Sequence, residues 1–134
     1  MVDSAQEQKV VGAVPTGLFI GGEWHPAENG ATFAVEDPST GRQLARVADA
    51  SPADGLRALD AAVKAQTGWA SVPPRERSDI LRRAYELLLE RQEDLALLMT
   101  LEMGKPLAEA RGEVAYAAEC FRWFSRGAVR ADGR

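Results

Sequence analysis

Few side chains in this sequence have the chemistry for catalysis, and His25, Cys120 and Lys105 are the main candidates. His25 is the only histidine and Cys120 the only cysteine, so neither has a second residue of its kind to share a metal ion. We expect His25 to be a surface residue of a strand. Cys120 lies between Glu119 and Phe121 in an apolar, aromatic helical segment, a setting that disfavours the reactive thiolate. We therefore expect Cys120 to be an inert core residue.

A phosphate-binding loop is the next candidate, because Lys105 directly follows Gly104. Met99 stands where such a loop needs its first glycine, and Pro106 replaces the hydroxyl that would contact magnesium, so a P-loop is excluded. The sequence also lacks the Gly-x-Gly-x-x-Gly fingerprint of dinucleotide binding.

Two carboxylates, Glu109 and Glu113, are one helical turn apart and could hold a cation between them. Lys105 and Arg111 are close by in the sequence, which favours a solvated helix face instead. On the residues alone, no active site is visible.

The segment 100–113 connects two strongly helical stretches. Gly104 can adopt the left-handed conformation that ends a helix, and Pro106 has the φ suited to the first turn of the next one. Lys105 lies between them, beside the negative end of the first helix. We predict that two helices meet at Gly104-Lys105-Pro106, called the helix joint below. A plain corner between helices is its simplest interpretation.

The first third of the chain has the patterns of strands. Gly21-Gly22 between two short apolar runs predicts a β-hairpin, and the turn-forming segment Asp37–Gly41 between two alternating runs predicts a second. The predicted strand pairs are Leu18–Ile20 with Glu23–His25, and Thr32–Glu36 with Gln43–Ala48. Residues 1–14 carry no periodic pattern, and we expect them to form a flexible N-terminal arm.

The remainder of the chain has helical spacing. Ser51-Pro52-Ala53-Asp54 joins a capping hydroxyl, a first-turn proline and an acid, which predicts the start of a helix. The predicted helices run from Ser51 to Gly68, from Arg75 to Arg91, from Gln92 to Gly104 and from Pro106 to about Val129. In the second helix an apolar stripe should face the interior, opposite Arg82 and Glu86. The stripe consists of Ile80, Leu81, Ala84, Leu87 and Leu88.

Composition narrows the class of protein. The chain has 134 residues, of which 46% are hydrophobic and 27% charged, as expected for one soluble globular domain. The net charge of −4 argues against nucleic acid or an anionic membrane as a partner. A single cysteine excludes an internal disulfide and fits a reducing compartment. No apolar run is long enough to span a membrane and the N-terminus lacks a signal core, so we expect a cytoplasmic protein.

Three stretches in this order and spacing resemble the N-terminal part of the aldehyde dehydrogenase superfamily. They are Leu18–Trp24, the turn Asp37-Pro38-Ser39-Thr40-Gly41, and Leu101-Glu102-x-Gly104-Lys105-Pro106 continuing through Glu109-Ala110-x-Gly112-Glu113. The final segment, Tyr116–Phe124, is similar to the succinate-semialdehyde dehydrogenase branch.

The resemblance implies an α/β fold in which residues 15–134 form part of the N-terminal, cofactor-binding domain. Two β-hairpins would be followed by four mainly antiparallel helices, and the Rossmann-like sheet would be missing. The implied activity is oxidation of an aldehyde, succinate semialdehyde by the branch resemblance, with NADP or NAD, in a homo-oligomer. The family's catalytic cysteine, glutamate and asparagine would lie beyond Arg134, so this chain alone would be an inactive fragment with no catalytic or cofactor-binding residue.

The resemblance also implies two sites within this chain. Many family members hold a monovalent cation, and the matching ligands are the backbone carbonyls of Val35 and Glu36 and the carboxylate of Glu102. Tyr116 or Phe124 would line the substrate tunnel; an ordinary core aromatic is the alternative. A free-standing helical binding module without catalysis is the alternative for the whole chain.

Overall fold

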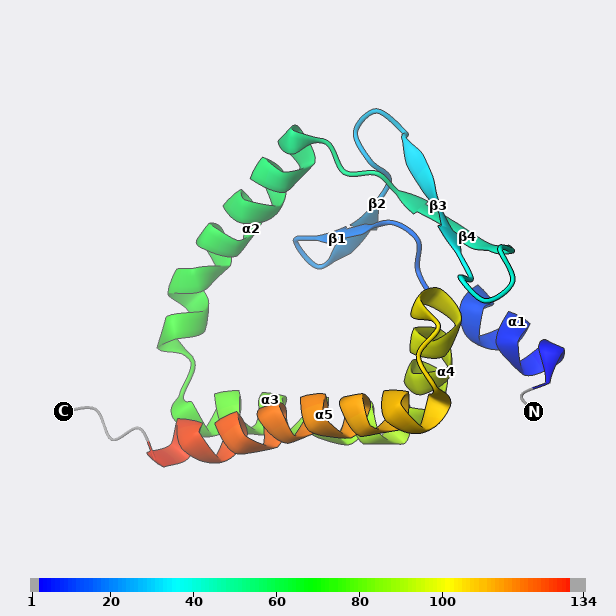
Figure 1. Ribbon diagram of the computed structural model, residues 1–134. Helices are drawn as coiled ribbons and strands as arrows, with labels where there is room; N and C mark the ends of the chain where they lie inside the picture. The colour runs from blue at the N-terminus through cyan, green and yellow to red at the C-terminus, as the bar shows by residue number, and fades with distance from the viewer. Residues whose placement is uncertain (1–2, 131–134) are drawn as a thin grey trace. The chain divides into compact units, whose positions relative to one another are not determined.

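The computed structural model describes residues 3–130 (Figure 1). These residues form two compact units. The first unit comprises the residues up to Ala70 together with Leu101–Gly104, and the second comprises Ser71–Thr100 and the residues from Lys105 onward.

The N-terminal segment of the first unit is a helix, α1 (Ser4–Gly12). The Asp3 carboxylate caps it by accepting a hydrogen bond from the Ala5 N–H, and Val10 is buried. Glu7 pairs with Arg42, with 3.1 Å between the Oε2 and Nη2 atoms. The sequence patterns did not predict this helix. The flexibility of the segment stays a prediction.

The first hairpin pairs β1 (Leu18–Ile20) with β2 (Glu23–His25) in antiparallel register. Gly21 and Gly22 have φ values of 64° and 94°, the left-handed conformation that a two-residue hairpin turn requires. Phe19 and Trp24 are directly opposite, and their ring centroids lie 5.0 Å apart. The predicted hairpin is confirmed.

The second hairpin pairs β3 (Thr32–Glu36) with β4 (Gln43–Ala48), also as predicted. Val35 pairs with Ala45 and Glu36 with Gln43, so the register shifts at the end of β3 that leads into the turn. Helix α2 (Pro52–Ser71) follows. It begins where the sequence predicts but continues past Gly68, the predicted end.

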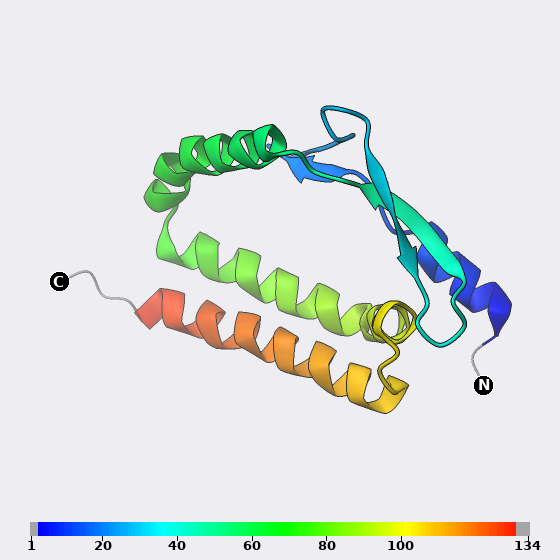
Figure 2. The ribbon, with the colours of Figure 1, turned by 45° about the horizontal axis from the view of Figure 1, so that its top comes forward.

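The second unit contains α3 (Pro74–Glu90) and α5 (Leu107–Arg130), which lie side by side and run in opposite directions in both views (Figures 1 and 2). The buried face of α5 is made of small residues, which lets neighbouring helices approach closely. Its members are Ala110, Val114, Ala118 and Ser125.

The predicted apolar stripe of α3 lies on the partly buried side of the helix except at Ile80, and Glu86, which was predicted to lie outside with Arg82, is partly buried as well. Leu81, Ala84, Leu87 and Leu88 are partly buried and Arg82 is exposed. Ile80 is 53% exposed. The prediction of Ile80 as an interior residue is therefore wrong in this chain. The 3.6-residue helical period places it between Ala84 and Leu87 on the same side of α3, so the period does not account for its exposure.

Helix α4 (Gln92–Met103) ends where the sequence predicts, at Gly104, whose φ is 74°. In the second unit, Ala96 of α4 forms a buried cluster with Ala110 and Val114 of α5. The expected fold class is confirmed: two antiparallel hairpins are followed by four helices, and the described residues contain no larger sheet. Within residues 3–130, no helix combines the length and apolar character needed to cross a membrane.

Candidate functional site

The turn between β3 and β4 is held by the buried carboxylate of Asp37, which is only 5% exposed. Its Oδ1 accepts a hydrogen bond from the Ser39 N–H and its Oδ2 accepts one from the Thr40 hydroxyl, both at 2.8 Å. The Thr40 hydroxyl is the main cause that lowers the pKa of Asp37, followed by the Ser39 N–H. The Asp37 carbonyl also accepts from the Gly41 N–H at 2.8 Å. These bonds fix the turn in one conformation.

This turn contacts the helix joint through Gly104. A Cβ atom placed on Gly104 would lie 3.2 Å from the Cγ of Pro38 and 3.9 Å from the Oγ of Ser39. The first approach is closer than ordinary van der Waals contact between carbon atoms. Two of the three stretches that carry the family resemblance therefore meet in the first unit.

Polar contacts in the second unit involve Lys105 of the helix joint and the residues that follow it in α5. The Lys105 ammonium pairs with Glu113. The Arg111 guanidinium donates to both carboxylate oxygens of Glu93 at 2.7–3.1 Å, a fork that lowers the pKa of Glu93 and raises that of Arg111. Gln92 also donates its side-chain amide to the Arg111 carbonyl at 3.0 Å. Glu113 thus has a cationic partner, as expected for a solvated face, and Glu109 is exposed.

The expected cation ligands lie next to the turn and the joint. Val35 and Glu36 are the last residues of β3, and Glu102 precedes Gly104 by two residues in the last turn of α4. Glu36 and Glu102 are exposed, and no hydrogen bond or ion pair engages the Glu102 carboxylate within residues 3–130. Two neutral carbonyl oxygens and one carboxylate suit a hard cation of low charge. The ligand types of Val35, Glu36 and Glu102 therefore fit a monovalent cation.

A metal site built from side chains alone is a different case. Within the described part of the chain, no three His, Cys, Asp or Glu side chains gather into a group that could hold a metal ion. His25 is half-buried on β2.

The two expected tunnel residues lie on α5 and are largely exposed in this chain. Tyr116 is 75% and Phe124 is 64% exposed, and Trp123, at 75%, lies close to the face of Tyr116. Cys120 is also exposed, which corrects the expectation of a core cysteine. The helical period explains the error: Cys120 is about 200° around the helix from the buried Ala118.

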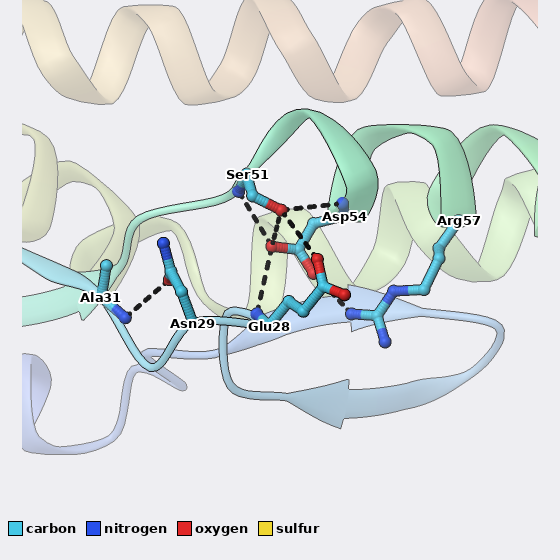
Figure 3. A network of polar contacts seen from close by, with 6 residues as sticks. All are labelled: Glu28, Asn29, Ala31, Ser51, Asp54 and Arg57. Atoms are coloured by element: carbon cyan, nitrogen blue, oxygen red, sulfur yellow. Dashed lines mark hydrogen bonds and ion pairs between the residues drawn. The ribbon is translucent and has the colours of Figure 1, made fainter.

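Figure 3 shows a polar network at the start of α2, of which the sequence patterns predicted only a part. The Asp54 carboxylate is 1% exposed and accepts from the Ser51 N–H at 2.8 Å, the Ser51 hydroxyl at 3.0 Å and the Glu28 N–H at 3.2 Å. Arg57 donates to its other oxygen at 2.5 Å. The Ser51 N–H is the main cause that lowers the pKa of Asp54 from 3.8 to about 2.

The link from Asp54 to Glu28 has no local signal, because the two residues are 26 positions apart. The capping pattern identified Ser51 and Asp54 but not the loop that they hold. The same loop is tightened locally by Asn29, which accepts from the Ala31 N–H at 2.8 Å (Figure 3).

Comparison with known proteins identifies the class to which this fold belongs. The aldehyde dehydrogenase family model matches residues 24–134. A glutarate-semialdehyde dehydrogenase from Pseudomonas putida is 49% identical over 115 residues, which make up 86% of this chain and 24% of that protein. A succinate-semialdehyde dehydrogenase from Paenarthrobacter nicotinovorans is 63% identical over 91 residues, 68% of this chain and 20% of that protein.

The solved structures agree. A double mutant of betaine aldehyde dehydrogenase from Staphylococcus aureus, in complex with NAD+, matches 96% of this chain and 26% of its own, with a TM-score of 0.90 and 27% identity. The chain therefore belongs to the aldehyde dehydrogenase family, whose members are oxidoreductases. It spans about a quarter or less of the length of these relatives.

Proposed function

We propose that this chain is the N-terminal part of an NAD(P)-dependent aldehyde dehydrogenase that oxidises succinate semialdehyde to the dicarboxylic acid. The 63% identity to a succinate-semialdehyde dehydrogenase over 91 residues is the observation that carries the proposal. The 49% identity to a glutarate-semialdehyde dehydrogenase makes the aldehyde with one more carbon the substrate to test beside it.

In this proposal the catalytic cysteine, glutamate and asparagine belong to the rest of the enzyme, and this chain contributes structure. The nicotinamide cofactor, when bound elsewhere in the enzyme, accepts hydride from the substrate. Helix α5 would border the substrate tunnel with Tyr116 or Phe124, which are exposed and free to contact another part of a larger protein. The enzyme would be a cytoplasmic homo-oligomer.

The chain would also hold a monovalent cation through the carbonyls of Val35 and Glu36 and the carboxylate of Glu102. Support comes from the donor chemistry and from the Pro38–Gly104 contact, which brings together the segments that carry these ligands.

A second candidate is a free-standing helical binding module. The observation that favours it is the exposed aromatic face of α5, formed by Tyr116, Trp123 and Phe124. Exposed apolar patches of this kind mark surfaces that another protein covers.

A chimera separates the two candidates. This chain should replace the matching N-terminal part of the Paenarthrobacter enzyme and give a folded oxidoreductase, assayed with succinate and glutarate semialdehydes and with NAD and NADP. The 134-residue chain alone should show no turnover. Cys120→Ser should leave the chimera fully active, because Cys120 is not the proposed nucleophile.

Two results would contradict the proposal. The first is turnover by the isolated chain that Cys120→Ser removes. The second is a folded chimera that binds its cofactor yet oxidises neither semialdehyde. A monomeric chain with a sharp cooperative melt and no affinity for a hydrophobic dye would favour the binding module.

A further inference from the structure

Pro38 and Gly104 lie close together, an approach called the turn–joint contact below, and a Cβ added at position 104 would lie 3.2 Å from the Pro38 Cγ. Among the described residues, four other glycines have a left-handed φ, but an added Cβ would meet no atom within 4 Å at any of them. They are Gly21, Gly22, Gly30 and Gly41. At Gly104 the left-handed φ strains any other residue, and a Cβ would also require the proline ring to shift by a few tenths of an ångström.

Both partners of this contact are held firmly in place. On one side, Pro38 follows Asp37, whose buried carboxylate accepts from the Ser39 N–H and the Thr40 hydroxyl. On the other side, Gly104 directly follows the last turn of α4, where Leu101 is buried. The contact therefore joins two segments that are each held by a buried neighbouring residue.

We propose that Pro38 and Gly104 are positioning residues for the monovalent-cation site, an inference that rests on the cation site of the proposed function. The carbonyls of Val35 and Glu36 lie on the strand that leads into the turn. Glu102 lies on the helix end that leads into the joint. The turn–joint contact sets how far the Glu102 carboxylate stands from the two carbonyl oxygens.

The ion pairs near Glu102 in the sequence agree with its proposed role as a cation ligand. The nearest cation in the sequence, Lys105, is already paired with Glu113. The Glu102 carboxylate makes no ion pair within residues 3–130 and is available to a bound cation. Pro38 and Gly104 are uncharged, so the turn–joint contact brings no second cation to compete for the Glu102 carboxylate.

The test is cation binding by the 134-residue chain, measured as ²³Na line broadening in a sodium chloride titration at constant ionic strength with choline chloride. Glu102→Gln removes the proposed charged ligand and should abolish the broadening. Gly104→Ala should weaken sodium binding by about 10-fold, the lower end of the effects seen for residues that support metal ligands. Gly30→Ala is the matched control, since Gly30 also has a left-handed φ but open space around it.

A second pair of variants covers the case in which Gly104→Ala does not fold, as judged by circular dichroism. Pro38→Ala removes the ring without adding a side chain to the joint and should also weaken sodium binding. In the Pro38→Ala background the effect of Gly104→Ala should shrink, because the atom that it meets is gone.

The outcomes separate this inference from the site on which it rests. Binding that Glu102→Gln abolishes and both Gly104→Ala and Pro38→Ala weaken, with Gly30→Ala unchanged, supports it. Binding that depends on Glu102 but is unaffected by Gly104→Ala and Pro38→Ala overturns the positioning role and leaves the cation site standing. Absence of sodium binding by the unmodified chain overturns the cation site and this inference together.

Discussion

The cap of α2 offers the sharpest test of how this chain is held together. Ser51→Ala removes the hydroxyl that accepts from the Asp54 N–H at 3.2 Å and donates to its carboxylate at 3.0 Å. The backbone N–H of residue 51 remains, so Asp54 keeps its shortest backbone donor, at 2.8 Å. Losing a hydroxyl N-cap costs about 1 kcal/mol, and we expect the free energy of unfolding to fall by about that amount.

Two Asp54 variants should differ in how strongly they destabilise the chain. Asp54→Ala removes the acceptor of three donors at Oδ2 and of Arg57 at Oδ1, and leaves the N–H groups of Glu28 and Ser51 without a partner. It should destabilise the chain more than Ser51→Ala does. Asp54→Asn can still turn its one carbonyl oxygen toward the three donors. It loses the contact with the half-exposed Arg57 and the negative charge that strengthens the other bonds, but it leaves no N–H group without an acceptor, so it should be milder than Asp54→Ala.

The assay is urea unfolding of the 134-residue chain followed by circular dichroism, with thermal melts beside it. A loss of 1 kcal/mol corresponds to a shift of about 2–8 °C in Tm for chains of this size range. Ser51→Thr keeps the hydroxyl and is the conservative control. Asp60→Ala, on the exposed part of the same helix, is the matched control for Asp54→Ala. A Ser51→Ala variant as stable as the parent, or Asp54→Ala no worse than Asp60→Ala, would refute the reasoning.

Two further predictions concern pH and the apolar surface. The folded-state pKa of Asp54 is about 2, below its ordinary 3.8, so the stability it contributes is present above about pH 4 and is lost as the pH falls toward 2. Asp54→Asn should flatten the pH dependence of urea unfolding in that window, and an unchanged slope would contradict the assignment. The isolated chain should bind a hydrophobic dye or self-associate through α5, because Tyr116, Trp123 and Phe124 are exposed. Tyr116→Ser with Trp123→Ser should reduce dye binding, whereas Val114→Ala, on the buried face, should not.

Local signals in the sequence were sufficient for most of the fold. Gly21-Gly22, the Ser51 cap and the Gly104 stop each have a short-range physical cause, and each lies where it was predicted. The helix α1 was missed because it is nine residues long and mostly polar. One of its contacts with the rest of the first unit is the pair between Glu7 and Arg42, which are 35 positions apart and leave no periodic pattern.

In the candidate site too, local patterns identified individual residues but not the long-range contact between them. Asp37 and Gly104 were both singled out as turn and joint residues, but only the family resemblance, through the implied cation ligands Val35, Glu36 and Glu102, indicated that their segments meet. Nothing in the spacing of 66 positions between Pro38 and Gly104 predicts a contact of 3.2 Å between a Cβ at position 104 and Pro38 Cγ. Long-range contacts of this kind depend on how whole elements pack, so sequence reasoning finds the two partners but not their pairing.

Helix α5 shows why the largest apolar residues misled the assignment of Cys120. Its buried face, Ala110 to Ser125, consists of small residues, whereas its bulky aromatics point away from α3 and stay exposed. Burying one large apolar side chain is worth about 1.5–3 kcal/mol, so covering this exposed aromatic face would add several kcal/mol of stability, on the order of 5 kcal/mol for the three side chains. The two proposals for this protein differ in what covers that face: the rest of a dehydrogenase in one, a separate partner in the other. Substitutions of Ala118 should therefore damage the protein under both, while substitutions of Trp123 should matter only once the covering surface is present.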